Sequence, residues 1–195
     1  MNMEKQNKPL TLPVLFQNIP LALRETPRWT MWNYVEIGEG ENKRWSKLPI
    51  QPSGKAASST NPTTWIDFIT AEKAYITGRF DGIGFIFTDD DDLVGIDLDD
   101  CYDLATSEFT NQELKEIANG VDGYMEISPS GTGVKIFTRS DFRLAHVDHD
   151  KGFEAYGRGR YFTVTGHKIK GIIPEESKDL THLIPERTVR ASGDA

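Results

Sequence analysis

The sequence predicts an α+β fold, rich in antiparallel strands with helices flanking the sheets. Short strand-like runs recur along the chain between turns rich in Gly, Asp and Ser. Helical spacing is confined to two segments. Because most neighbouring strand-like runs are joined by short loops, we expect them to pair antiparallel.

In chain order, two strands and a helix come first. The strands are expected at Trp29–Glu36 and Arg44–Ile50, joined by a turn rich in Gly and Glu. The helix is expected from Pro62 to about Thr77, since Asn61 can cap it and proline suits a first helical turn.

An acidic hairpin is expected next. The runs Ile83–Thr88 and Leu93–Leu98 are separated by Asp89–Asp92, which we expect to be a solvated turn. A second helix is expected from Asn111 to about Ala118. Four more strand-like runs follow: Gly123–Ser128, Val134–Thr138, Phe153–Tyr156 and Tyr161–Thr165.

Length and composition bound the class of protein. The chain has 195 residues, 37% of them hydrophobic, which suffices for one domain with a core. We expect that domain at residues 11–186, between a disordered N-terminus (1–10) and a flexible tail (187–195). No run reaches the roughly 20 apolar residues of a membrane span, and the single Cys101 fits a reducing compartment. A cytoplasmic protein without a membrane partner is expected.

The net charge of −8 comes from one segment. Residues 89–103 contain eight aspartates and no Lys or Arg, so the rest of the chain is balanced in charge. Such a local concentration of negative charge is typical of a cation site, although an acidic hairpin loop has the same composition.

Alternation along Leu93–Cys101 places Asp97 and Asp99 together on the exposed face of a half-buried strand, with Asp100 pointing away. Two strand residues advance about 6.6 Å, so the two carboxylates lie side by side. A cation beside them relieves their repulsion. Mg²⁺ accepts such oxygen ligands and usually brings phosphates with it. The alternative is a solvated acidic strand end.

The segment Glu126–Phe137 contains a loop with the features of an anion site. Its glycines allow backbone N–H groups to converge, and Ser128, Ser130 and Thr132 add hydroxyl donors. Lys135, just inside the following strand, can supply a cation to a phosphate. The alternative is a tight hairpin that uses glycine for its geometry.

A third segment, Phe153–Gly166, adds one carboxylate and two guanidinium groups. Glu154 lies in a strand-like run, and Arg160 would suit a triphosphate or a template strand. By itself, Glu154 would be interpreted as a surface residue. The pair His146 and His149 does not indicate zinc, which normally takes four ligands, because the single cysteine lies far away in sequence. Since the pair lies in a polar stretch between strand-like runs, we expect it in an exposed loop.

Together these segments resemble the three motifs of the archaeo-eukaryotic primase superfamily, and most closely the primase-polymerase domains of phages and plasmids. The motifs are Ile96–Asp100, Ser128–Phe137, and Glu154 with Arg160–Gly166. The resemblance covers roughly residues 27–172. It implies a primase-polymerase, RRM-like catalytic core.

The resemblance implies nucleotidyl transfer with two divalent ions, Mg²⁺ or Mn²⁺. Asp97, Asp99 and Glu154 would be the catalytic, metal-binding carboxylates. In the middle motif the family usually has a histidine where this chain has Lys135, which donates to phosphate as a point charge. The implied nucleotide-binding residues are Ser128, Ser130, Gly131, Gly133, Lys135, Arg160, Lys47 and Asn61.

The implied function is that of a DNA primase or DNA polymerase in the replication of a phage, plasmid or other mobile element, in the cytoplasm of a bacterial host. The partners would be nucleoside triphosphates, a single-stranded DNA template, and a helicase in trans or on a longer chain. Two alternatives stay open: a weak or inactive primase-fold module that binds DNA or nucleotides in replication initiation, and a metal-dependent nuclease. Template contacts are expected at Lys151, Arg158, Lys168 and Lys170.

Overall fold

The computed structural model describes residues 7–141, 146–148 and 150–183. Residues 1–6 of the predicted disordered N-terminus, the whole predicted tail 187–195 and His149 lie outside this range. The chain divides into two compact units. The first comprises Met1–Ile86, Ser128–Gly131 and Tyr161–His167, and the second comprises Phe87–Ile127, Thr132–Arg160 and Lys168–Ala195.

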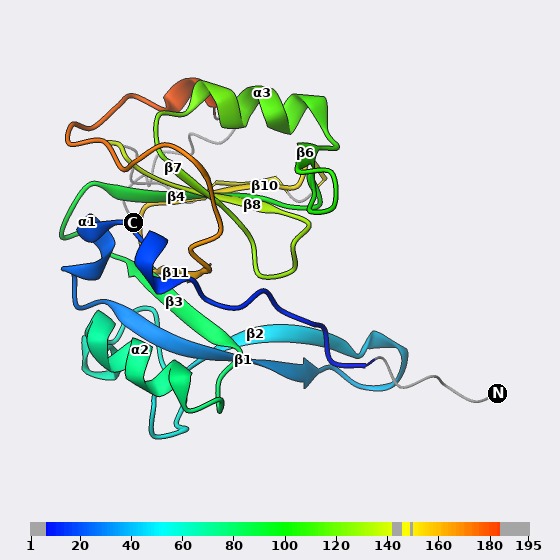
Figure 1. The fold of residues 1–195 in the computed structure, drawn as a ribbon, viewed down its shortest axis with the longest axis vertical. Helices are drawn as coiled ribbons and strands as arrows, with labels where there is room; N and C mark the ends of the chain where they lie inside the picture. Colours follow the sequence, from blue (N-terminus) through cyan, green and yellow to red (C-terminus); the bar gives the residue numbers. More distant parts are fainter. Residues whose placement is uncertain (1–6, 142–145, 149, 184–195) are drawn as a thin grey trace, which may run out of the picture. The chain divides into compact units, whose positions relative to one another are not determined.

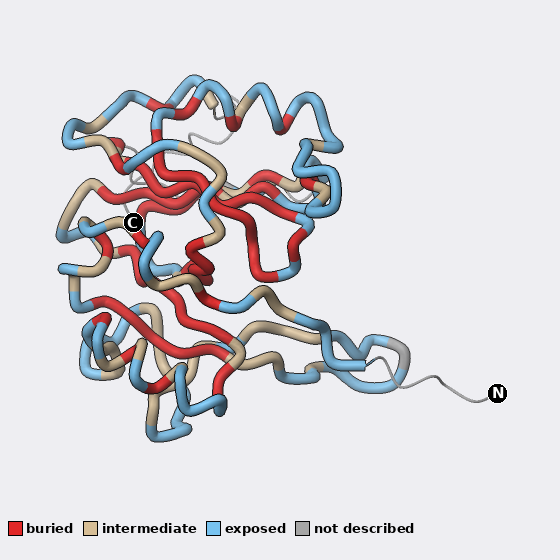
Figure 2. Tube along the Cα trace, in the orientation of Figure 1, coloured by how far each residue is buried: buried red, intermediate tan, exposed pale blue. Residues whose placement is uncertain are grey.

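The first unit is built on a four-stranded sheet with the strand order β11-β3-β1-β2 (Figure 1). Helix α2 packs against β1. Trp29 anchors the core, since its ring meets Phe68 of α2 and Phe85 of β3 edge to face, at centroid distances of 5.1 and 5.3 Å. Figure 2 shows the buried stretch of β1 in red. The strands are β1 (Trp29–Ile37), β2 (Arg44–Ile50), β3 (Gly82–Phe87) and β11 (Arg160–Val164).

The predicted helix from Pro62 to about Thr77 is two helices, so that prediction was wrong in its extent. Asn61 accepts a hydrogen bond from the backbone of Thr63 and caps only a short 3-10 turn. Asp67 accepts one from Thr70 at 2.7 Å and begins α2. Between the two caps, Ile66 pairs with the backbone of Trp29, which keeps the chain extended there.

The helices of the first unit are η1 (Phe16–Asn18), α1 (Leu21–Arg24), η2 (Gly40–Asn42), η3 (Pro62–Thr64) and α2 (Phe68–Ile76).

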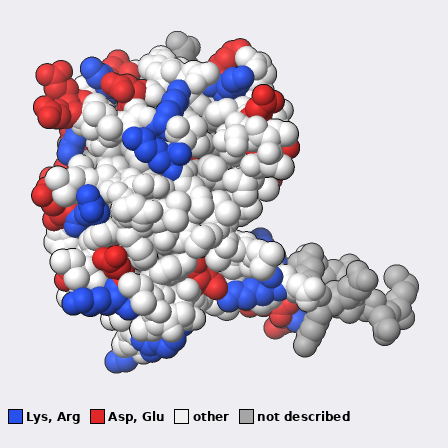
Figure 3. All heavy atoms as spheres, in the orientation of Figure 1, with Lys and Arg blue, Asp and Glu red and all other residues white. Residues whose placement is uncertain are grey.

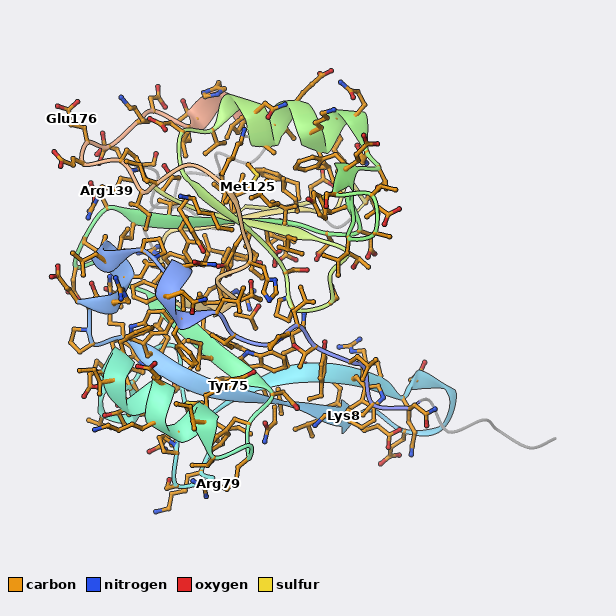
Figure 4. The ribbon with its side chains drawn as sticks, in the orientation of Figure 1. Lys8, Tyr75, Arg79, Met125, Arg139 and Glu176 are labelled. Carbon is orange, nitrogen blue, oxygen red and sulfur yellow. The ribbon has the colours of Figure 1, made fainter. Side chains whose placement is uncertain are left out.

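The N-terminal segment is tied to the first unit from residue 8 onward. The ammonium of Lys8, labelled in Figure 4, lies 2.8 Å from a carboxylate oxygen of Asp81. The backbone N–H of Val14 donates to the hydroxyl of Tyr75 at 3.1 Å. Val14 is buried, so this segment contributes to the core of the unit.

The second unit is built on a six-stranded antiparallel sheet with the strand order β12-β7-β8-β4-β10-β9, and α3 covers one of its faces (Figure 1). The strands are β4 (Leu93–Leu98), β7 (Tyr124–Ile127), β8 (Val134–Arg139), β9 (His146–Asp148), β10 (Phe153–Tyr156) and β12 (Lys168–Lys170), with the small pair β5 (Tyr102–Asp103) and β6 (Glu108–Phe109) and the helices α3 (Gln112–Gly120) and η4 (Thr181–Leu183). Among the described residues, no helix has the length and apolar character needed to cross a bilayer.

Two sequence predictions about strands were wrong. The runs on either side of the acidic loop do not form a hairpin, because β3 pairs with β1 whereas β4 pairs with β8 and β10. The segment with His146 is not a loop but β9, which pairs with β10 at an edge of the sheet. Edge strands carry little hydrophobic signal, and short β9 and β12 were both missed for that reason.

Candidate active site

One face of the six-stranded sheet carries charged side chains from four neighbouring strands. Lys135 of β8 lies directly opposite Asp97 of β4, and Asp97 lies opposite Glu154 of β10. On its other side, Lys135 lies opposite Glu126 of β7. Directly opposed residues of an antiparallel pair project to the same face. Glu126, Lys135, Asp97 and Glu154 therefore form one line across the sheet, here called the charged row.

Asp97 and Lys135 form an ion pair within the charged row. The ammonium of Lys135 donates to Oδ2 of Asp97, and the two side chains are only 6% and 16% exposed, in that order. Oδ1 of Asp97 is buried and accepts no hydrogen bond from the described residues. Asp97 is therefore only partly exposed, whereas Asp99, predicted on the same face, is exposed.

Asp99 and Asp100 follow β4, which ends at Leu98. The backbone N–H of Asp99 donates to the carbonyl of Gly152 at 2.8 Å, so the pairing with the neighbouring strand continues for one more residue. Asp100 has a φ of +47°, which turns the chain, and its carboxylate accepts from Thr132 at 3.1 Å. The exposed carboxylates of Asp99 and Asp100 therefore differ in their surroundings. Asp99 extends the paired segment of β4, whereas Asp100 lies in the turn that follows it.

Glu154 is half-buried and held by a tyrosine on its own strand. The hydroxyl of Tyr156 donates to Oε2 of Glu154 at 3.0 Å, and the guanidinium of Arg160 lies over the Tyr156 ring, 4.8 Å from its centroid. Burial, followed by the charge of Glu154, raises the pKa of Tyr156 to about 12. The phenol therefore remains a hydrogen-bond donor to Glu154 at physiological pH.

The carboxylates suit a hard divalent cation by their chemistry. The buried Oδ1 of Asp97 is a polar atom that such a cation would satisfy. As placed in the described residues, however, no three His, Cys, Asp or Glu side chains gather into a metal-binding group. Metal binding by Asp97, Asp99 and Glu154 therefore stays a prediction.

The loop between β7 and β8 is a compact hydrogen-bonded turn. Ser128 and Ser130 share a hydrogen bond of 3.0 Å between their hydroxyls. The backbone N–H of Gly131 donates to the carbonyl of Ser128 at 2.9 Å, and Gly131 has a φ of +79°, which favours glycine. The hairpin interpretation is confirmed, while phosphate binding by Ser128, Ser130, Gly131 and the buried Gly133 stays a prediction.

The sequence-predicted nucleotide contacts divide between the two units. Ser128, Ser130 and Gly131 belong to the first unit, as do Lys47 and Asn61. Within that unit, the ammonium of Lys47 lies 6.0 Å from the ring centroid of Tyr34, and Asn61 serves as the cap of η3. Members of the second unit are Asp97, Asp99, Gly133, Lys135, Glu154 and Arg160.

The predicted template contacts all lie in the second unit, and three of them have polar partners there. Lys151 pairs with Glu113 at 2.8 Å, Arg158 pairs with Asp89 at 3.4 Å, and Lys170 donates to Asn119 at 2.8 Å. In Figure 3, basic atoms gather over the segment that contains β12, the strand that carries Lys168 and Lys170. This edge of the sheet therefore carries a basic patch in that view.

Glu126 is the residue of the charged row that the sequence reasoning missed. It stands in an apolar strand, between the buried side chains of Met125 and Ile127. A signal was present: a six-residue hairpin loop places Ile127 opposite Val134, and therefore Glu126 opposite Lys135. Local register alone would have identified this pair.

Comparison with known proteins gives one informative match. No family model matches the chain. The chain is 34% identical over 171 residues to a protein named DNA primase-polymerase from Nitratiruptor phage NrS-1. The match covers 83% of this chain and 22% of the relative, so the chain spans about a fifth of that protein. This similarity confirms the resemblance to phage primase-polymerases and supports a primase-polymerase domain of the phage type.

Proposed function

We propose that this chain is the nucleotidyl-transferase domain of a phage-type primase-polymerase, with an RRM-like catalytic core, that joins nucleotides on a single-stranded DNA template. The charged row is the observation that carries the proposal. It brings Asp97 and Glu154 into register on adjacent strands, with Asp99 two residues beyond Asp97. The similarity to a DNA primase-polymerase over most of the chain supports the same reaction class.

In this proposal each residue of the site has a definite task. Two Mg²⁺ or Mn²⁺ ions, when bound, would neutralise phosphate charge and lower the pKa of the attacking hydroxyl. Asp97, Asp99 and Glu154 would hold them, with Tyr156 orienting Glu154 through the hydrogen bond described above. Lys135 would donate to a phosphate oxygen.

The remaining contacts serve the nucleotide and the template. Arg160 is proposed as a further phosphate contact in the second unit, and Ser128, Ser130, Gly131, Lys47 and Asn61 as nucleotide contacts in the first. Electrostatic binding of the template by exposed basic side chains such as Lys168 would be salt-dependent. We further propose a helicase partner, in trans or on a longer polypeptide, and action in the cytoplasm of a bacterial host.

A second candidate is a primase-fold module that binds nucleotides or DNA without catalysis. The ion pair between Lys135 and Asp97 is the observation that favours it, because the ammonium already satisfies one oxygen of a carboxylate needed for metal binding. Retained DNA binding without nucleotide incorporation would identify such a module.

Incorporation of labelled nucleotides tests the proposal. The protein is incubated with primed and unprimed single-stranded DNA, ribo- or deoxynucleotides, and Mg²⁺ or Mn²⁺. Products that lengthen with time establish a polymerase, and products in the unprimed reaction establish a primase. Folded protein that binds DNA but forms no product would refute the enzymatic proposal. Release of nucleotides from DNA without synthesis would instead indicate a nuclease.

A further inference from the structure

Glu126 is a wholly buried carboxylate at one end of the charged row. Its side chain has no exposed surface, and its neighbours on β7, Tyr124 and Met125, are buried as well (Met125 is labelled in Figure 4). The hydroxyl of Tyr124 donates to Oε2 of Glu126 at 3.0 Å. A hydroxyl does not neutralise a charge, and a buried carboxylate is costly unless a cation compensates it.

Two lysines lie opposite Glu126, one on each neighbouring strand. Lys135 of β8 is 6% exposed at its side chain and belongs to the charged row. Lys168 of β12 is exposed and sits at a shift in the strand register. A buried carboxylate gains more from a buried cation than from a solvated one, because water screens the latter. Lys135 is therefore the counter-ion that the geometry favours.

Lys135 consequently stands between two carboxylates, with Asp97 on one side and Glu126 on the other. An ammonium group has three donors and can serve both acids and a third acceptor. With Asp97 as its sole counter-ion, the buried ammonium would lose its stabilisation whenever that carboxylate bound a cation. A second carboxylate on the opposite side removes this conflict.

We propose that Glu126 is a positioning residue, which anchors the ammonium of Lys135 from the side opposite Asp97 and so keeps Lys135 in place for the triphosphate. This inference rests on the proposed function and deepens it. Glu126 touches neither nucleotide nor metal in this account. It acts through Lys135, and its removal should weaken nucleotide binding more than it slows the chemical step.

A double-mutant cycle tests the coupling. The variants are Glu126→Gln, Lys135→Gln and the double variant, because glutamine keeps the size of Glu126 and still accepts from Tyr124. Primer extension gives KM for the nucleotide and kcat, and urea unfolding gives the midpoint of each protein. Glu126→Gln should raise KM roughly tenfold, as expected for one charge-assisted contact, with a smaller change in kcat. In the Lys135→Gln background the same substitution should change KM by less than about twofold.

Lys168→Gln provides the matched control, because Lys168 is the other lysine opposite Glu126. The effect of Glu126→Gln on KM should persist in that background. If the effect disappears there, or is equal with and without Lys135, the proposal is overturned. If Glu126→Gln does not fold, Glu126→Asp, which keeps the charge on a shorter side chain, replaces it in the cycle, and an effect on KM that is equal with and without Lys135 again overturns the proposal.

The outcomes separate this inference from the proposed function. Wild-type product formation without coupling between Glu126 and Lys135 overturns the inference alone. Absence of product from folded wild-type protein overturns the proposed function, and the role of Glu126 in nucleotide binding with it.

Discussion

The end of the acidic loop is predicted to be a structural anchor, and Asp92→Asn tests this directly. The carboxylate of Asp92 accepts hydrogen bonds from Arg139 of β8 and from Ser177 (Figure 4 labels Arg139 and Glu176, the neighbour of Ser177). The side chains of Asp92 and Arg139 are 26% and 24% exposed. Burial by itself would raise the pKa of Asp92, but the hydrogen bonds from Ser177 and Arg139 and the Arg139 charge lower it overall.

The hydrogen bonds and exposure of Asp92 set the expected loss of stability in Asp92→Asn. Hydrogen bonds to a charged group contribute about 1.5–3 kcal/mol each. Because a quarter of each side chain meets solvent, we expect a loss of about 1–2 kcal/mol in total for Asp92→Asn. In a chain of this length 1 kcal/mol shifts the melting temperature by about 2–4 °C. Calorimetry at pH 7 should therefore show a Tm lower by about 2–8 °C.

The difference in Tm between wild type and Asp92→Asn should depend on pH. A carboxylate whose folded-state pKa is lowered stabilises the fold fully above its unfolded-state pKa, and this stabilisation is lost as the pH falls through the folded-state value. The Tm values of wild type and Asp92→Asn should therefore converge only below pH 3.8, the ordinary pKa of an aspartate.

Asp90→Asn is the matched control, because Asp90 is exposed and bonds within the loop to Thr88. It should change stability by less than about 0.5 kcal/mol. Equal Tm values for the two variants would refute the reasoning. So would a gap between wild type and Asp92→Asn that persisted unchanged well below pH 3.8.

Two further predictions concern a glycine and the support of Glu154. Gly171→Ala should cost about 3 kcal/mol or more in urea unfolding, because the added Cβ would lie 1.9 Å from the carbonyl oxygen of Gly123. Gly159 has a similar positive φ, but a Cβ added there would meet no atom of the described residues within 4 Å. Gly159→Ala should therefore cost only about 1 kcal/mol. Equal losses of stability in the two glycine variants would contradict this reasoning. Tyr156→Phe removes the donor to Glu154 and should lower kcat/KM for the nucleotide roughly threefold to tenfold; an unchanged value would show that this hydrogen bond has no part in the reaction.

The sequence predicted individual strands well where local patterns decide them. The strands Arg44–Ile50, Leu93–Leu98 and Phe153–Tyr156 have the predicted bounds, because apolar and turn residues mark both of their ends. The cap of α3 at Asn111 was also readable from the sequence. The pairing partners of the strands could not be predicted from these local patterns. Proximity in the chain suggested that β3 pairs with β4, whereas each strand instead pairs with segments distant in sequence.

The candidate site shows the same division between local and distant information. Spacing alone indicated that Asp97 and Asp99 belong together, and the hairpin register would have placed Glu126 opposite Lys135. The position of Lys135 between Asp97 and Glu126 depends on the pairing of β8 with β4, which are 35 or more residues apart in the chain. The sequence also suggested solvent at Asp97, whose side chain is only 16% exposed in the structure. The side chains of Lys135 and Glu154 lie beside it because β8 and β10 pair with β4, and neither pairing is visible in the local pattern.

Primer extension by Asp97→Asn and Asp100→Asn, side by side with wild type, tests the central claim most directly. The two aspartates lie three residues apart, and asparagine tolerates the positive φ of Asp100. If Asp97 holds the ion that serves the reaction, Asp97→Asn should lower the rate by about a hundredfold or more, since even residues that only support a metal ligand are worth ten- to a hundredfold. Asp100→Asn should extend primers at a rate close to that of wild type. Equal rates in the two variants, with both proteins folded, would contradict the assignment of this site.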